Sequence, residues 1–174
     1  MSVFDEIMDS NKKYQKKHTT LEKFPLLPKK GLAVLTCVDM RLQGVLEEAM
    51  GLKRGDAVFI RTAGNNLNYG EIRSVITAVY KYDIKALLVV GHEDCGMGRC
   101  EDHKLQELML QRGIREEDLA EYDNLDMWLG CFRDEKENVR DTVKKLSAYS
   151  LTPEDLEIRG VYFSISTGEL EPVT

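Results

Sequence analysis

The sequence has no long apolar segment. No run approaches the roughly 18 consecutive apolar residues that a membrane-spanning helix needs. The first residues, Met-Ser-Val-Phe-Asp-Glu, also lack the apolar core of a secretory signal. We therefore expect a protein that is neither exported nor partnered with a membrane.

Positive charge is also scarce. The chain has 24 Lys and Arg against 30 Asp and Glu, which gives a net charge of -6 and a pI near 5.2. Binding to nucleic-acid phosphates needs clustered Lys and Arg. The one basic cluster, residues 12–17, is short and follows acidic residues, so we interpret it as a solvated helix face. We expect no nucleic-acid partner.

Cysteine and histidine are few, with four and three residues respectively. The cysteines are irregularly spaced and no secretory signal precedes them. This pattern favours reduced thiols in a cytoplasmic protein, where metal binding or burial is more common than disulfide formation.

What the sequence does contain is an alternation of apolar runs and amphipathic segments. We expect strands at 32–38, 57–60, 86–90 and 161–165, an edge strand at 170–173, and helices at 3–17, 42–50, 72–80 and 139–146. This order predicts an α/β fold, an open mostly parallel sheet flanked by helices, with an antiparallel edge strand at the C-terminus. Residues 98–137 are polar and weakly periodic, with one helical candidate at 105–110.

A single domain is expected over residues 1–174, with residues 1–30 as an N-terminal helical arm. Ser2 and Asp5 resemble a capping box at the start of that arm. Phe4, Ile7 and Met8 form a short apolar stripe on an otherwise polar helix. Such a stripe has to pack against another surface.

Candidate metal ligands follow two of the predicted strands. His92 and Cys95 come directly after the strand at 86–90, and Cys37 lies at the end of the strand at 32–38. The carboxyl ends of parallel strands share one edge of a sheet, so these side chains should meet. Three N and S ligands with a vacant fourth position are typical of a catalytic zinc ion, Zn2+. Asp39 and Arg41 follow Cys37. The Arg41 guanidinium can hold the Asp39 carboxylate beside such a metal.

A different zinc site competes with this one. Cys100 and His103 lie shortly after Cys95, so His92, Cys95, Cys100 and His103 can form a closed, structural four-ligand site that omits Cys37. The convergence of Cys37 and His92 at one sheet edge favours the three-ligand set.

The ligand motifs resemble those of the beta-class carbonic anhydrases. The segments Cys37-Val-Asp-Met-Arg41 and His92-Glu-Asp-Cys95 fit the family patterns Cys-x-Asp-x-Arg and His-x-x-Cys, with Met40 where Ser is common. Further segments are similar to the short, archaeal-type branch: Arg54-Gly-Asp-Ala, Ile60-Arg-Thr-Ala-Gly-Asn65, Ile72-Arg-Ser74, Gly96-Met97 and Ser166-Thr-Gly168. The likeness therefore covers nearly the whole chain.

The resemblance implies a zinc lyase. Zinc would be held by Cys37, His92 and Cys95, and zinc-bound hydroxide would attack carbon dioxide to give bicarbonate, reversibly. It also implies catalytic roles for Asp39 and Arg41. Gly96 and Arg61 would contact the substrate, and the enzyme would be a homodimer or a higher homo-oligomer. In this family the aspartate either pairs with the arginine or moves onto the metal; we expect the paired, open form because Arg41 holds it by charge-assisted hydrogen bonds.

Two other functions stay open at this point. A hydrolase of carbonyl sulfide or carbon disulfide resembles the same branch and uses the same ligands. A non-enzymatic module with a structural zinc ion is the second alternative, and it would rely on His103.

Overall fold

The computed structural model describes residues 2–18, 20–99 and 104–173. Its strands are β1 (Leu32–Cys37), β2 (Ala57–Thr62), β3 (Ala86–His92), β4 (Glu157–Phe163) and β5 (Leu170–Val173). Its α-helices are α1 (Val3–Lys17), α2 (Val45–Ala49), α3 (Tyr69–Lys81), α4 (Lys104–Gln111), α5 (Glu116–Leu119), α6 (Leu125–Leu129) and α7 (Glu135–Ser147). Short 3-10 helices are η1 (Met40–Leu42), η2 (Ala63–Asn65) and η3 (Gly96–Arg99).

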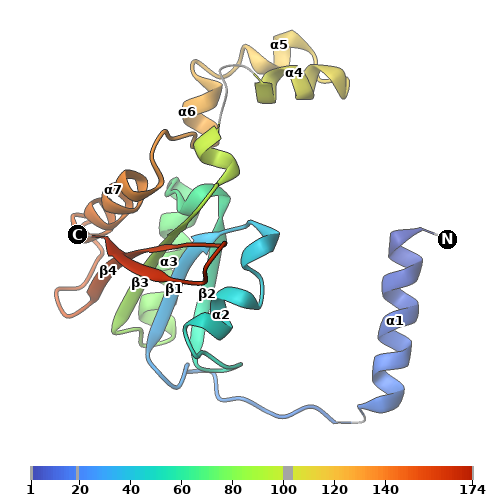
Figure 1. The fold of residues 1–174 in the computed structure, drawn as a ribbon, viewed down its shortest axis with the longest axis vertical. Coiled ribbons are helices and arrows are strands. Elements are labelled where there is room, and N and C mark those ends of the chain that lie inside the picture. The colour runs from blue at the N-terminus through green and yellow to red at the C-terminus, as the bar shows by residue number, and fades with distance from the viewer. Residues whose placement is uncertain (1, 19, 100–103, 174) are drawn as a thin grey trace.

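The strands form one sheet in the order β2-β1-β3-β4-β5 (Figure 1). Neighbouring strands are parallel from β2 to β4, and β5 runs antiparallel to β4. The predicted fold class is therefore confirmed, including the antiparallel edge strand at the C-terminus.

Both faces of the central strands are buried, which explains their nearly continuous apolar sequences. Ala33 and Leu35 of β1 pack into a core with residues of α3 and α7. Val34 faces the opposite way and packs with Leu42 and Leu46. Helices thus cover both faces of the sheet.

Some predicted boundaries were wrong. The continuous helix at 42–50 is broken at Gly44, whose φ of 81° separates η1 from α2. The strand expected at 161–165 begins earlier, at Glu157, and ends at Phe163. Residues 104–129 form three helices and not one, because short polar helices carry little apolar periodicity.

The amino-terminal arm lies apart from the sheet in Figure 1. Ser2 and Asp5 make the predicted capping box, and no residue of α1 is buried. Further along, Phe24 anchors the arm by lying against Gly55, beneath the Arg54 guanidinium at 4.6 Å from its ring centre. Among the described residues, no helix combines the length and apolarity needed to span a membrane.

Candidate metal centre

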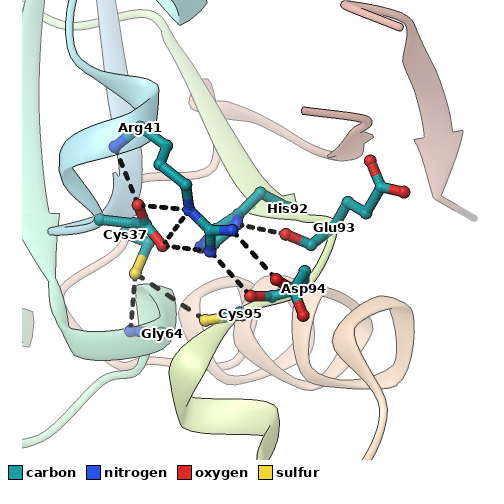
Figure 2. Close-up of polar contacts among 8 residues, drawn as sticks. Cys37, Arg41, Gly64, His92, Glu93, Asp94 and Cys95 are labelled. Carbon is teal, nitrogen blue, oxygen red and sulfur yellow. Dashed lines mark hydrogen bonds and ion pairs between the residues drawn. The ribbon is translucent and has the colours of Figure 1, made fainter. Parts of the chain in front are cut away.

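Two adjacent strands bring the predicted ligands together. Cys37 is the last residue of β1 and His92 the last of β3, and these strands pair in parallel. Cys95 follows in the turn before η3. All three side chains are buried, and their ligand atoms lie within 4.8 Å of one another. The predicted convergence at one sheet edge is therefore present (Figure 2).

The imidazole of His92 is oriented for a metal. Its Nδ1 lies 2.8 Å from the carbonyl oxygen of Glu93. A carbonyl can only accept, so Nδ1 carries a proton, which leaves Nε2 as the nitrogen that a metal would bind. Nε2 is buried and makes no hydrogen bond. An unpaired buried nitrogen facing two thiols is what a soft metal ion would satisfy.

The two thiols also indicate a cation. The Sγ atoms of Cys37 and Cys95 are 3.9 Å apart, and the Gly64 N–H donates to Cys37 Sγ at 3.3 Å. The hydrogen bond between the two thiols is the main reason that the pKa of Cys37 lies well below its usual range. The same bond, with burial, raises the pKa of Cys95. Without a metal the pair keeps one proton; a divalent cation would allow both to be thiolates.

Asp39 and Arg41 form a tightly bonded pair beside the ligands. Arg41 donates from Nε to Asp39 Oδ1 at 3.0 Å and from Nη2 to Oδ2 at 2.7 Å. These hydrogen bonds are the largest cause of the lowering of the Asp39 pKa to about 2. The carboxylate therefore stays ionised throughout the neutral range, in the paired arrangement expected from the sequence.

Asp94 is a member of the cluster that the motif did not single out. It lies between the two ligands of the His92-x-x-Cys95 segment and accepts two hydrogen bonds from Arg41, one on its side chain and one on its carbonyl (Figure 2). Its position inside the ligand motif was the only available signal. Glu93, next to it, accepts a hydrogen bond from the Ser166 N–H at 2.9 Å, which lowers its pKa and joins this turn to the β4–β5 connection.

A cavity of about 580 Å³ opens beside this cluster. Its lining residues are Arg41, Glu93, Asp94, Glu135, Ile165 and Ser166. Arg41 therefore lies between this cavity and the turn that joins His92 to Cys95.

The two residues predicted to contact the substrate, Arg61 and Gly96, lie at the margin of the Cys37, His92 and Cys95 cluster. Arg61 donates to the Cys37 carbonyl at 3.3 Å and pairs with Glu47 at 2.8 Å. Gly96 is exposed at the start of η3, and Met40 is 85% exposed. Substrate contacts by Arg61 and Gly96 stay predictions.

The competing ligands Cys100 and His103 lie outside the described residues. Within the described part of the chain, the group that can hold a metal ion is Cys37, His92 and Cys95. The expectation that all cysteines are reduced was wrong for Cys131, which is disulfide-bonded.

Comparison with known protein families matches residues 32–170 to carbonic anhydrase. The chain is 32% identical to a putative carbonic anhydrase of Bacillus subtilis, YtiB, over 98% of this chain and 96% of the relative. This chain belongs to the beta-carbonic anhydrase family. The expected family and enzyme class, a lyase of the carbonic anhydrase type, are confirmed.

The fold of this chain also matches a solved structure of the family. The beta-carbonic anhydrase isoform I of Trichomonas vaginalis superimposes with a TM-score of 0.93 at 29% identity, covering 99% of this chain and 98% of that one. A carbon disulfide hydrolase of Saccharolobus solfataricus is 26% identical over 80% of this chain and 75% of the relative. The archaeal-type branch stays a prediction, since these relatives come from different groups.

Proposed function

We propose that this protein catalyses the zinc-dependent, reversible hydration of carbon dioxide to bicarbonate. The observation that carries the proposal is the buried set of Cys37, His92 and Cys95, with His92 Nε2 unpaired and an ionised carboxylate beside it. Zinc fits two sulfur ligands and one nitrogen, and it would supply the Lewis acidity that makes water reactive near neutral pH.

The chain's own residues then have separate tasks. Cys37, His92 and Cys95 would hold the ion, with the Glu93 carbonyl fixing the imidazole and the Gly64 N–H stabilising the Cys37 thiolate. An oxygen of Asp39 would accept a hydrogen bond from the reacting water. Arg41 keeps that oxygen ionised and fixed in place.

Substrate contacts are the finer part of the proposal. The Gly96 N–H would donate to bicarbonate, since the glycine is exposed next to Cys95. Arg61 would act from the side of β2, through its hydrogen bond to the Cys37 carbonyl. Its ion pair with Glu47 favours a positioning role over direct contact.

Hydrolysis of carbon disulfide or carbonyl sulfide is the second candidate. It is supported by similarity to the Saccharolobus solfataricus carbon disulfide hydrolase. Both reactions use a metal-activated water on a small linear molecule, so the ligand set does not distinguish them.

One experiment tests the choice. The zinc-loaded protein is assayed with carbon dioxide by stopped-flow, and with carbonyl sulfide and carbon disulfide by sulfide release, on a single preparation. We expect the highest kcat/KM with carbon dioxide and its loss in Cys95→Ala. A higher kcat/KM with either sulfur compound would replace the proposal by the hydrolase; no turnover of any gas despite full zinc would favour the structural-zinc module.

We also propose a homodimer. A compact monomer of 19.9 kDa exposes about 8,700 Å² by the usual scaling with mass, whereas this chain exposes 12010 Å². The α1 stripe contributes to the excess, with Phe4 74% and Ile7 57% exposed. A second copy of the chain would cover it. The cytoplasmic location stays a prediction from the sequence.

A further inference from the structure

The guanidinium of Arg41 is shared between two turns. Asp39, the N-cap residue of η1, accepts hydrogen bonds from Nε and Nη2. From the turn after β3, Asp94 accepts one from Nη1 on Oδ2 at 3.0 Å and one from Nη2 on its carbonyl oxygen at 2.8 Å. Figure 2 shows the Arg41 guanidinium beside Asp94. One side chain thus joins the ends of β1 and β3.

Asp94 has an unusual backbone conformation. Its φ is 56°, in the left-handed region that glycine adopts freely and that other residues adopt at some conformational cost. In this conformation both its carbonyl and its carboxylate contact Arg41. A glycine would keep the carbonyl contact and remove the backbone strain, so any advantage of aspartate here has to come from the carboxylate.

We propose that Asp94 is a positioning residue for the metal site. Its carboxylate holds Arg41, and Arg41 in turn holds Asp39 at a fixed place relative to His92 and Cys95. Only the kinetic consequence of this inference rests on the proposed function. The geometric consequence, a fixed Asp39 beside an open metal position, holds for any reaction at this centre.

The simpler interpretation is a solvent-screened surface pair. The side chains of Arg41 and Asp94 are 39% and 36% exposed, and exposed ion pairs usually contribute little. Asp94, however, adds a backbone contact to the ion pair, and its partner is also bonded to Asp39. Cooperation within such a network is measurable as non-additivity between variants.

Asp83 provides a matched control at the other end of β3. It also has a left-handed backbone, with φ at 50°, and it pairs with Lys85 at 3.1 Å, both largely exposed. Asp83→Gly therefore relieves a similar strain and removes a similar pair, far from the metal ligands. Any effect common to both glycine variants belongs to the backbone and not to the site.

The test is titration of the cobalt-substituted protein with azide, followed by the visible spectrum, which reports the metal coordination without turnover. With Asp94→Gly, a less restrained Asp39 carboxylate would compete with azide for the open position. We expect the azide Kd to rise on the order of tenfold, as for loss of a charged hydrogen bond. Asp94→Asn keeps an acceptor oxygen and should stay within about threefold of the unmodified protein.

Two further results complete the test. Asp83→Gly should leave the Kd unchanged, and adding Asp94→Gly to Arg41→Ala should have no further effect. The proposal is overturned if Asp94→Gly leaves the Kd unchanged, or if it raises the Kd equally in the Arg41→Ala background. Asp94→Ser, which also lacks the carboxylate, replaces the glycine variant if that variant does not retain cobalt.

The kinetic readout is separate. In the zinc protein, Asp94→Gly should lower kcat/KM for carbon dioxide about tenfold, at unchanged zinc content. A protein that hydrates no carbon dioxide would refute the proposed function, and the azide titration would still decide the role of Asp94.

Discussion

The metal-site edge of the sheet and the amino-terminal arm differ most in burial. Cys37, His92 and Cys95 are 4%, 1% and 1% exposed. No residue of α1 is buried, although the helix has a well-formed cap. The three candidate ligands lie together within one chain, whereas the apolar stripe of the arm has no partner among the described residues. Changes at the edge should therefore affect chemistry, and changes on the arm should affect assembly.

The largest expected effect comes from replacing His92 at the metal-site edge, with His18 on the arm as the control. His92→Ala removes the only nitrogen in the ligand set, so we expect loss of most of the zinc and a fall in carbon dioxide hydration on the order of 1,000-fold or more. His18 is exposed and stacks on Tyr14, so His18→Ala should keep both the zinc and the hydration activity. Metal analysis and stopped-flow assays measure this, and equal zinc in the two variants would contradict the assignment.

Next in size is Arg41→Ala. It removes the guanidinium hydrogen bonds to Asp39 and leaves the one from the backbone N–H of residue 41, so we expect hydration to fall on the order of 100-fold while zinc content is kept. The control is Arg115→Ala, which breaks a similar two-point pair with Asp118 on the surface. Comparable rates for the two variants would show that the Asp39–Arg41 pair has no role in turnover.

Assembly should respond to the arm. Ile7→Asp places a charge in the exposed stripe, so we expect the dimer to dissociate at least tenfold more readily while each chain keeps its zinc. Lys13→Asp, on the opposite side of the helix, should leave the dimer intact. Light scattering over a dilution series distinguishes the two. A stable dimer with Ile7→Asp would place the interface elsewhere.

The smallest effect tests packing directly behind the site. A Cβ at Gly91 would lie 2.5 Å from Val139 Cγ2, so Gly91→Ala should lower the free energy of unfolding by about 1–3 kcal/mol. Gly70, in α3, has nothing within 4 Å of the same position, and Gly70→Ala should not destabilise. Urea unfolding of both variants measures the difference, and equal midpoints would mean that the contact relaxes freely.

The same contrast explains what could be predicted from the sequence. The positions of the ligands at the ends of β1 and β3 could be predicted. Each strand has a continuous apolar pattern that ends at a candidate ligand, and parallel neighbouring strands end at the same edge of the sheet. The helix boundary at Gly44 and the helices at 104–129 could not be predicted, because short polar segments lack periodicity. Asp94 was missed because its role depends on a left-handed backbone and on Arg41, which is 53 residues away in sequence.

The central claim, that Cys37 joins His92 and Cys95 on one zinc ion, is tested most directly by zinc X-ray absorption of the zinc-loaded protein and of Cys37→Ser. We predict two sulfur neighbours at about 2.3 Å and lighter atoms at about 2.0 Å in the unmodified protein, and at most one sulfur neighbour in Cys37→Ser. Two sulfurs retained in Cys37→Ser would mean that another cysteine completes the site, and the assignment of Cys37 would be wrong.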